Sequence, residues 1–74
     1  MSVGSRIKSE VQARDLTMPE LVKRVQAAGW EDFTQSTASK IASDRRSVTV
    51  EECAAIAHAL GVSPSYLAGY SPRP

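Results

Sequence analysis

Apolar residues recur along this chain at three- and four-residue intervals, a spacing that places them on one side of a helix. Val3, Ile7 and Val11 form the first such stripe, between charged residues, on a helix that we expect to end near Asp15. One short run, Ser47–Val50, alternates polar and apolar residues, but it also fits the start of a helix. The pattern therefore predicts helices and no strands.

Capping signals indicate where the later helices begin. Thr17 and Glu20, and again Thr49 and Glu52, have the spacing at which a cap hydroxyl and a carboxylate each bind the other residue's backbone N–H. Further caps are expected at Thr34 and Ser63, and left-handed residues that end helices at Gly29, Gly61 and Gly69. These signals divide the chain into five short helices.

Length and charge narrow the class of protein. With 74 residues, 42% of them apolar, the chain is long enough for one globular domain. We expect residues 1–70 to form an all-α domain, a compact bundle of five short helices, and residues 71–74 to be a disordered tail. The net charge of +1 argues against a protein that binds any polyanion. However, residues 34–47 carry a net charge of +2 and residues 48–61 one of −2, so the surface is polarised.

Few side chains are available for metal binding or catalysis. A single Cys53 and a single His58 cannot form a four-ligand zinc site or an internal disulfide, so we expect no metal and no cofactor. We expect Cys53 in the core and His58 at the surface. No catalytic set of residues can be assembled, which makes an enzyme the least favoured class. The absence of a long apolar run or signal peptide predicts a cytoplasmic protein that does not bind membranes.

The order of these elements resembles the helix-turn-helix domains of the phage-repressor (Cro-type) family, and especially the repressors of lambdoid phages. The resemblance covers about residues 5–68 and is carried by four segments in register, Ser5–Ser9, Leu16–Val22, Thr34–Ile41 and Ile56–Ser63. It implies a lambda-repressor-like fold in which the second and third helices form the helix-turn-helix. It also implies that the third helix, at about residues 34–43, lies in the major groove of double-stranded DNA.

The third helix carries the candidate base contacts. Gln35, Ser36 and Lys40 are expected to contact bases, because Gln can pair with adenine and Lys can reach guanine O6 and N7. The candidate phosphate contacts are Thr37 and Ser39 on the same helix, and by resemblance Arg45 and Arg46 in the following loop and the main chain of Met18.

Three departures from the family pattern bear on this expectation. The link from Val25 to Thr34 is about six residues longer than the usual turn, which can change the angle of the third helix. Ala42 and Val11 stand where relatives have an acidic residue and its Arg partner, so we expect an apolar contact in place of an ion pair. Asp44 stands in place of a loop glycine; it can still adopt a left-handed backbone, but less readily than glycine.

The leading hypothesis is a sequence-specific DNA-binding transcription regulator, a repressor from a phage, prophage or bacterium that acts at the nucleoid. Because one short helix contacts only a few base pairs, we expect a homodimer on a two-fold site. By resemblance, the candidate dimer contacts are Tyr66, Leu67 and Tyr70.

An alternative hypothesis is a module of the same fold that binds a protein, such as an antitoxin or a regulatory subunit. The near-neutral charge and Trp30 favour it, because an exposed Trp beside Glu31 and Asp32 can contact a partner. Trp30 can equally cover the core beside the long turn. Salt-sensitive retention on heparin would favour DNA binding, whereas a stable protein complex without retention would favour the alternative.

Overall fold

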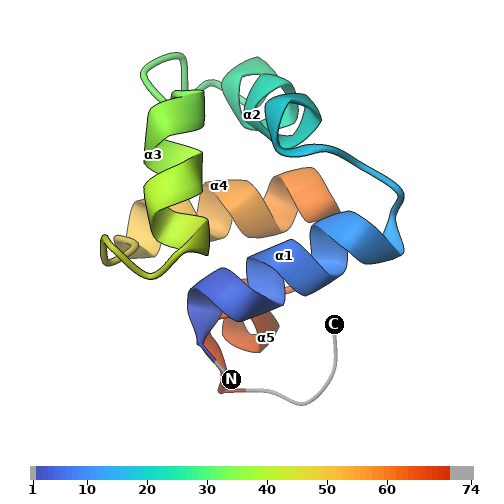
Figure 1. Cartoon of the computed structure of the whole chain (residues 1–74), viewed down its shortest axis with the longest axis vertical. Coiled ribbons are helices and arrows are strands. Elements are labelled where there is room, and N and C mark those ends of the chain that lie inside the picture. The colour runs from blue at the N-terminus through green and yellow to red at the C-terminus, as the bar shows by residue number, and fades with distance from the viewer. Residues whose placement is uncertain (1, 71–74) are drawn as a thin grey trace.

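Five helices account for most of residues 2–70, which are the residues that the computed structural model describes. They are α1 (Val3–Ala13), α2 (Met18–Ala27), α3 (Gln35–Ala42), α4 (Val50–Leu60) and α5 (Pro64–Ala68). No strand occurs in this part of the chain, so the predicted all-α fold is confirmed (Figure 1). The expected tail at residues 71–74 lies outside the described residues.

The helices begin and end where the capping signals predict. Both capping boxes are present, with the Thr17 and Thr49 hydroxyls bound to the amides three residues later and the two carboxylates bound in return. Gly61 ends α4 with φ 74°, a left-handed conformation in which a side chain is strained. Asp15 also has a positive φ, 56°, just after the end of α1.

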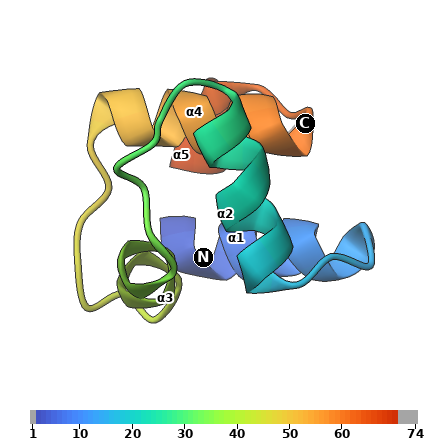
Figure 2. The same ribbon diagram turned by 90° about the horizontal axis from the view of Figure 1, so that it is seen from above.

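The helices enclose one core. In Figure 2, α1 lies along one side, α4 and α5 lie along the other, and α2 crosses between them. Helix α3 stands at one edge, packed against α1 and α2, and is seen nearly end-on in the same view. The largest side chains that are almost fully buried are Ile7, Leu21, Val25, Ile56 and Leu67. Four of the five helices therefore contribute large residues to the same core, and α3 adds Ala38 and Ile41.

Polar contacts attach α5 to α1. The Tyr66 hydroxyl donates a hydrogen bond to Glu10 Oε1 at 2.7 Å, and Glu10 also pairs with Arg14. Arg6 Nη1 donates to the Tyr66 carbonyl at 3.3 Å, and its guanidinium lies 5.4 Å from the centre of the Tyr66 ring. The hydrogen bond from Tyr66, and then that from Arg14, lowers the pKa of the Glu10 carboxyl below its usual value.

Replacing Tyr66 by Phe is expected to destabilise the fold in a pH-dependent way. Because the pKa of Glu10 is lowered in the folded state, this contact stabilises the fold above the ordinary Glu pKa and loses its effect as the pH falls through the folded value. Urea unfolding should therefore show a lower midpoint for Tyr66→Phe at about pH 7 and a smaller difference at about pH 3. An equal difference at both pH values would contradict this account.

Candidate nucleic-acid interface

Helix α3 presents a continuous polar face to solvent. Its buried side consists of Ala38, Ile41 and Ala42. At about 100° per residue, Ser36, Ser39 and Lys40 lie away from this side, while Gln35 lies close to Ala42 around the helix; all four side chains are exposed. The three predicted base-contacting residues therefore lie together on one surface, the α3 face. Ser39 lies between Gln35 and Ser36 around the helix, so it belongs with them, and helical periodicity alone would have placed it there.

The N-terminus of α3 is held by a cap that uses Thr37. The Thr37 amide donates to Thr34 Oγ1 at 3.3 Å, and the two hydroxyls lie 3.2 Å apart. Thr37 is half-buried and stands at the border of the α3 face. The structure thus places this predicted phosphate contact in the cap of α3, whereas Ser39 is freely exposed.

The long turn between α2 and α3, residues 28–34, is ordered by its own hydrogen bonds. Gln26 Nε2 donates to the Phe33 carbonyl at 2.7 Å, and the Phe33 amide donates to the Trp30 carbonyl at 3.1 Å. Phe33 is buried and anchors the turn to the core, while Trp30 is 37% exposed and outside the core. The turn therefore has a defined conformation, which fixes the position of the Thr34 cap at the start of α3.

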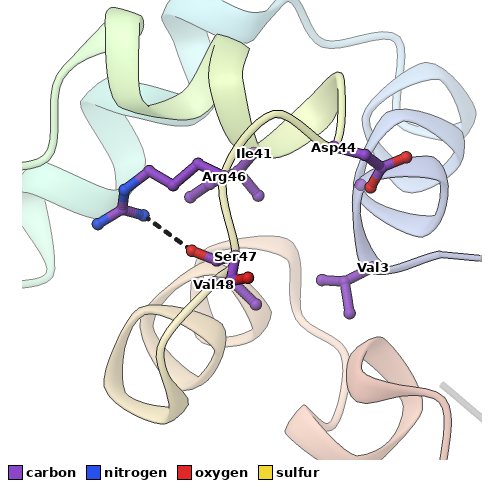
Figure 3. A pocket seen from close by; sticks show the side chains of 7 residues that line it. Val3, Ile41, Asp44, Arg46, Ser47 and Val48 are labelled. Atoms are coloured by element: carbon purple, nitrogen blue, oxygen red, sulfur yellow. Dashed lines mark hydrogen bonds between the residues drawn. The ribbon is translucent and has the colours of Figure 1, made fainter.

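The start of α1 packs directly against the end of α3. A Cβ atom at Gly4 would lie 2.5 Å from the Ile41 carbonyl oxygen and 2.9 Å from that of Ala42, so only glycine permits this approach. Asp44 has φ 61°, the left-handed conformation expected there, and its Oδ2 accepts a hydrogen bond from Ser2 Oγ at 2.9 Å. Figure 3 shows Asp44 beside the start of α1, next to a cavity of about 310 Å³.

Val11 and Ala42, for which the resemblance predicts an apolar contact, are both buried. The close approach at Gly4 and the Ser2–Asp44 hydrogen bond link α1 to the end of α3. Sequence reasoning missed these links because neither residue pair has a recognisable spacing.

The two arginines of the loop after α3 have different surroundings. Arg45 is exposed and its Nε donates to Ser43 Oγ at 2.9 Å. Arg46 donates from Nη1 and Nη2 to the two carboxylate oxygens of Glu52, at 2.8 and 2.9 Å. It also donates from Nη1 to the Ser47 carbonyl, the hydrogen bond drawn in Figure 3. The hydrogen bonds between the two side chains, more than their opposite charges, raise the pKa of Arg46 and lower that of Glu52. Arg46 thus forms an ion pair with a residue of α4, whereas Arg45 has no acidic partner within residues 2–70.

The N-terminus of α2 offers few free amides. The capping box uses the amides of Thr17 and Glu20, and Pro19 has none, which leaves that of Met18. The Met18 side chain is half-buried against the core. However, the Glu20 carboxylate lies at the same helix end, so a phosphate there would meet a negative charge.

The three candidate dimer contacts lie in different surroundings. Leu67 is fully buried in the core, which removes its side chain from any surface. Tyr66 is half-buried with its hydroxyl bound to Glu10, and Tyr70 is 89% exposed. Tyr70 borders a largely apolar groove of about 400 Å³ that runs between α4, α5 and the start of α1. Val50, 83% exposed, lines the same groove and was not predicted to do so, because a helix start gives no signal of exposure.

As expected, Cys53 is buried, where desolvation raises the pKa of its thiol, and His58 is exposed. Among residues 2–70, no three His, Cys, Asp or Glu side chains are grouped so as to hold a metal ion. In the same part of the chain, no helix has the length and apolar character needed to span a membrane.

Comparison with known proteins gives one match. A family model described as helix-turn-helix matches residues 7–67, from within α1 to within α5. Neither the curated proteins nor the solved structures include a protein that matches this chain.

Proposed function

Because the chain belongs to the helix-turn-helix family of DNA-binding domains, we propose that it is a sequence-specific transcription regulator, and specifically a repressor of the phage type. In this proposal α3 lies in the major groove of double-stranded DNA. The observation that carries it is the α3 face, on which four exposed polar side chains lie together and are followed by the exposed Arg45.

The side chains of the α3 face suit contact with base edges. Ser36 and Ser39 are short, so the helix backbone can approach the base pairs closely. Gln35 near the N-terminus can pair with the N6 and N7 groups of adenine, and Lys40 can donate to guanine O6 and N7. Arg45 and the Met18 amide would then bind phosphates and fix the position of α3 in the groove, with the Met18 contact weakened by the Glu20 carboxylate beside it.

We propose further that two copies bind a two-fold symmetric site. An eight-residue helix can contact only a few base pairs, so one copy would hold its site weakly. The groove between α4 and α5 offers a surface for the second copy, because Val50 and Tyr70 expose large apolar side chains beside it. Tyr66 would support this surface through its contact with α1.

Selection from a pool of duplexes with a randomised centre tests the proposal. We expect one sequence with two related half-sites to be enriched, and sedimentation of that selected duplex with the protein to show two copies bound. Failure to enrich any sequence would contradict the proposed function. Enrichment of a single half-site bound by one copy would contradict the dimer alone.

A second candidate function is binding to a protein, which the exposed Trp30 favours. The adjoining Glu31 and Asp32 are also exposed, so this turn would suit a partner with a basic surface. Binding to heparin that falls steeply with salt supports DNA binding over this candidate.

A further inference from the structure

We propose that Glu52 competes with DNA phosphate for Arg46 and thereby weakens binding to every duplex. This inference rests on the proposed function, because it requires that the loop after α3 faces the DNA backbone. Glu52 thus lowers the affinity for DNA, in addition to capping the start of α4.

The contact between the two side chains is bidentate. Arg46 Nη1 and Nη2 each donate to a different oxygen of Glu52, at 2.8 and 2.9 Å. The Arg46 side chain is 38% exposed and that of Glu52 is 12% exposed. The guanidinium is therefore accessible to an incoming phosphate while its partner carboxylate is largely covered.

Glu52 is fixed in place by the start of α4. Its Oε1 accepts a hydrogen bond from the Thr49 amide at 3.0 Å, and its own amide donates to Thr49 Oγ1 at 3.1 Å. Because the cap holds this carboxylate, it cannot move away together with Arg46. A phosphate that binds Arg46 must either separate the pair or lie close to a second negative charge, and both lower the gain from the contact.

The competition affects all sequences alike. Phosphates are the same in every duplex, so weakening a phosphate contact lowers specific and non-specific affinity by the same factor. The ion pair is also weak enough for phosphate to displace it, because the Arg46 side of the pair is in contact with solvent. Arg45, in the same loop, has no acidic partner within residues 2–70 and supplies an unopposed contact.

Four variants and the wild type separate this competition from other effects. Glu52→Gln removes the charge but keeps an acceptor for the Thr49 amide, since Gln also serves in a capping box. Arg46→Gln and the double variant complete a cycle. Glu51→Gln is the matched control, because Glu51 is an exposed glutamate on the same turn and forms no ion pair in the described chain. Dissociation constants are measured over a salt series for the selected duplex and for an unrelated one.

We expect Glu52→Gln to bind both duplexes about three- to tenfold more tightly, with the slope of log K against log salt steeper by about 0.9. Arg46→Gln should change the wild-type affinity less than about twofold but should abolish the gain in the Glu52→Gln background. Weaker or unchanged binding by Glu52→Gln, an equal gain from Glu51→Gln, or an equal loss from Arg46→Gln in both backgrounds would overturn the inference. Failure of all the proteins to prefer the selected duplex would instead overturn the proposed function.

Discussion

Replacing Gln35 and Lys40 together by alanine is expected to lower affinity for the selected duplex about 100-fold, because each pairing with a base contributes about 1–3 kcal/mol. Both side chains lie on the α3 face and are exposed, so their removal should leave the folded structure intact. Affinity for unrelated DNA should fall much less, since only the charge of Lys40 contributes there. Titration of the double variant against both duplexes measures the difference.

Arg45→Gln is the matched control for this prediction. Arg45 lies three residues beyond the end of α3, is exposed, and faces no carboxylate in the described chain. We expect its loss to weaken binding to both duplexes by the same factor and to reduce the salt slope by about 0.9. If the alanine variant instead lost affinity equally for both duplexes, the α3 face would contribute charge and no sequence preference.

Alanine in place of Gly4 is expected to lower the free energy of unfolding by about 2 kcal/mol, within the range for overpacked sites. The added Cβ would overlap the carbonyl oxygens of Ile41 and Ala42, which are backbone atoms that cannot rotate away. This overlap outweighs the gain of about 1 kcal/mol that alanine normally brings to a helix. Thermal unfolding should show a midpoint about 10 °C lower.

Ser9→Ala provides the comparison for Gly4→Ala. Ser9 is exposed on the same helix and forms no side-chain hydrogen bond within residues 2–70, so its replacement should change stability by less than about 0.5 kcal/mol. If Gly4→Ala proved as stable as Ser9→Ala, α1 and α3 could separate without cost, and the approach at Gly4 would not hold α3 in place.

The helices could be predicted from the sequence because their caps are local. Thr17 with Glu20 and Thr49 with Glu52 interact across three residues, and each pair forms the box that its spacing predicts. The contacts that join helices have no such spacing. Tyr66 and Glu10 are 56 residues apart in the chain, and no local pattern connects them. The same holds for Ser2 and Asp44, which lie 42 residues apart.

The part of the candidate site that lies on α3 could largely be predicted, because helical periodicity determines which residues of one helix are exposed. The exposure of Ser36, Ser39 and Lys40 follows from the position of the buried residues of α3 around the helix. Gln35 lies close to Ala42 around the helix, so its exposure at the first residue of α3 does not follow from this periodicity. The sequence could not show that Arg46 binds Glu52, because a loop of unknown path separates them.

Nor could the apolar pattern show which residues are available to a second copy. Leu67 was predicted to contact one by resemblance, but an apolar residue on the inner side of a helix suits a core equally well, and Leu67 lies in the core. Val50 is the opposite case, an apolar residue at the start of α4 that remains exposed.

The central claim, that α3 contacts base edges in the major groove, is tested most directly with modified duplexes. Substitution of single purines by 7-deazaguanine or 7-deazaadenine removes one N7 acceptor from the major groove and leaves the phosphates unchanged. We predict that 7-deazaguanine in place of one guanine in each half-site lowers the affinity of the wild type about tenfold. The same replacement should not change the affinity of the Lys40→Ala variant. Equal binding of the wild type to the unmodified duplex and to every modified one would contradict the claim.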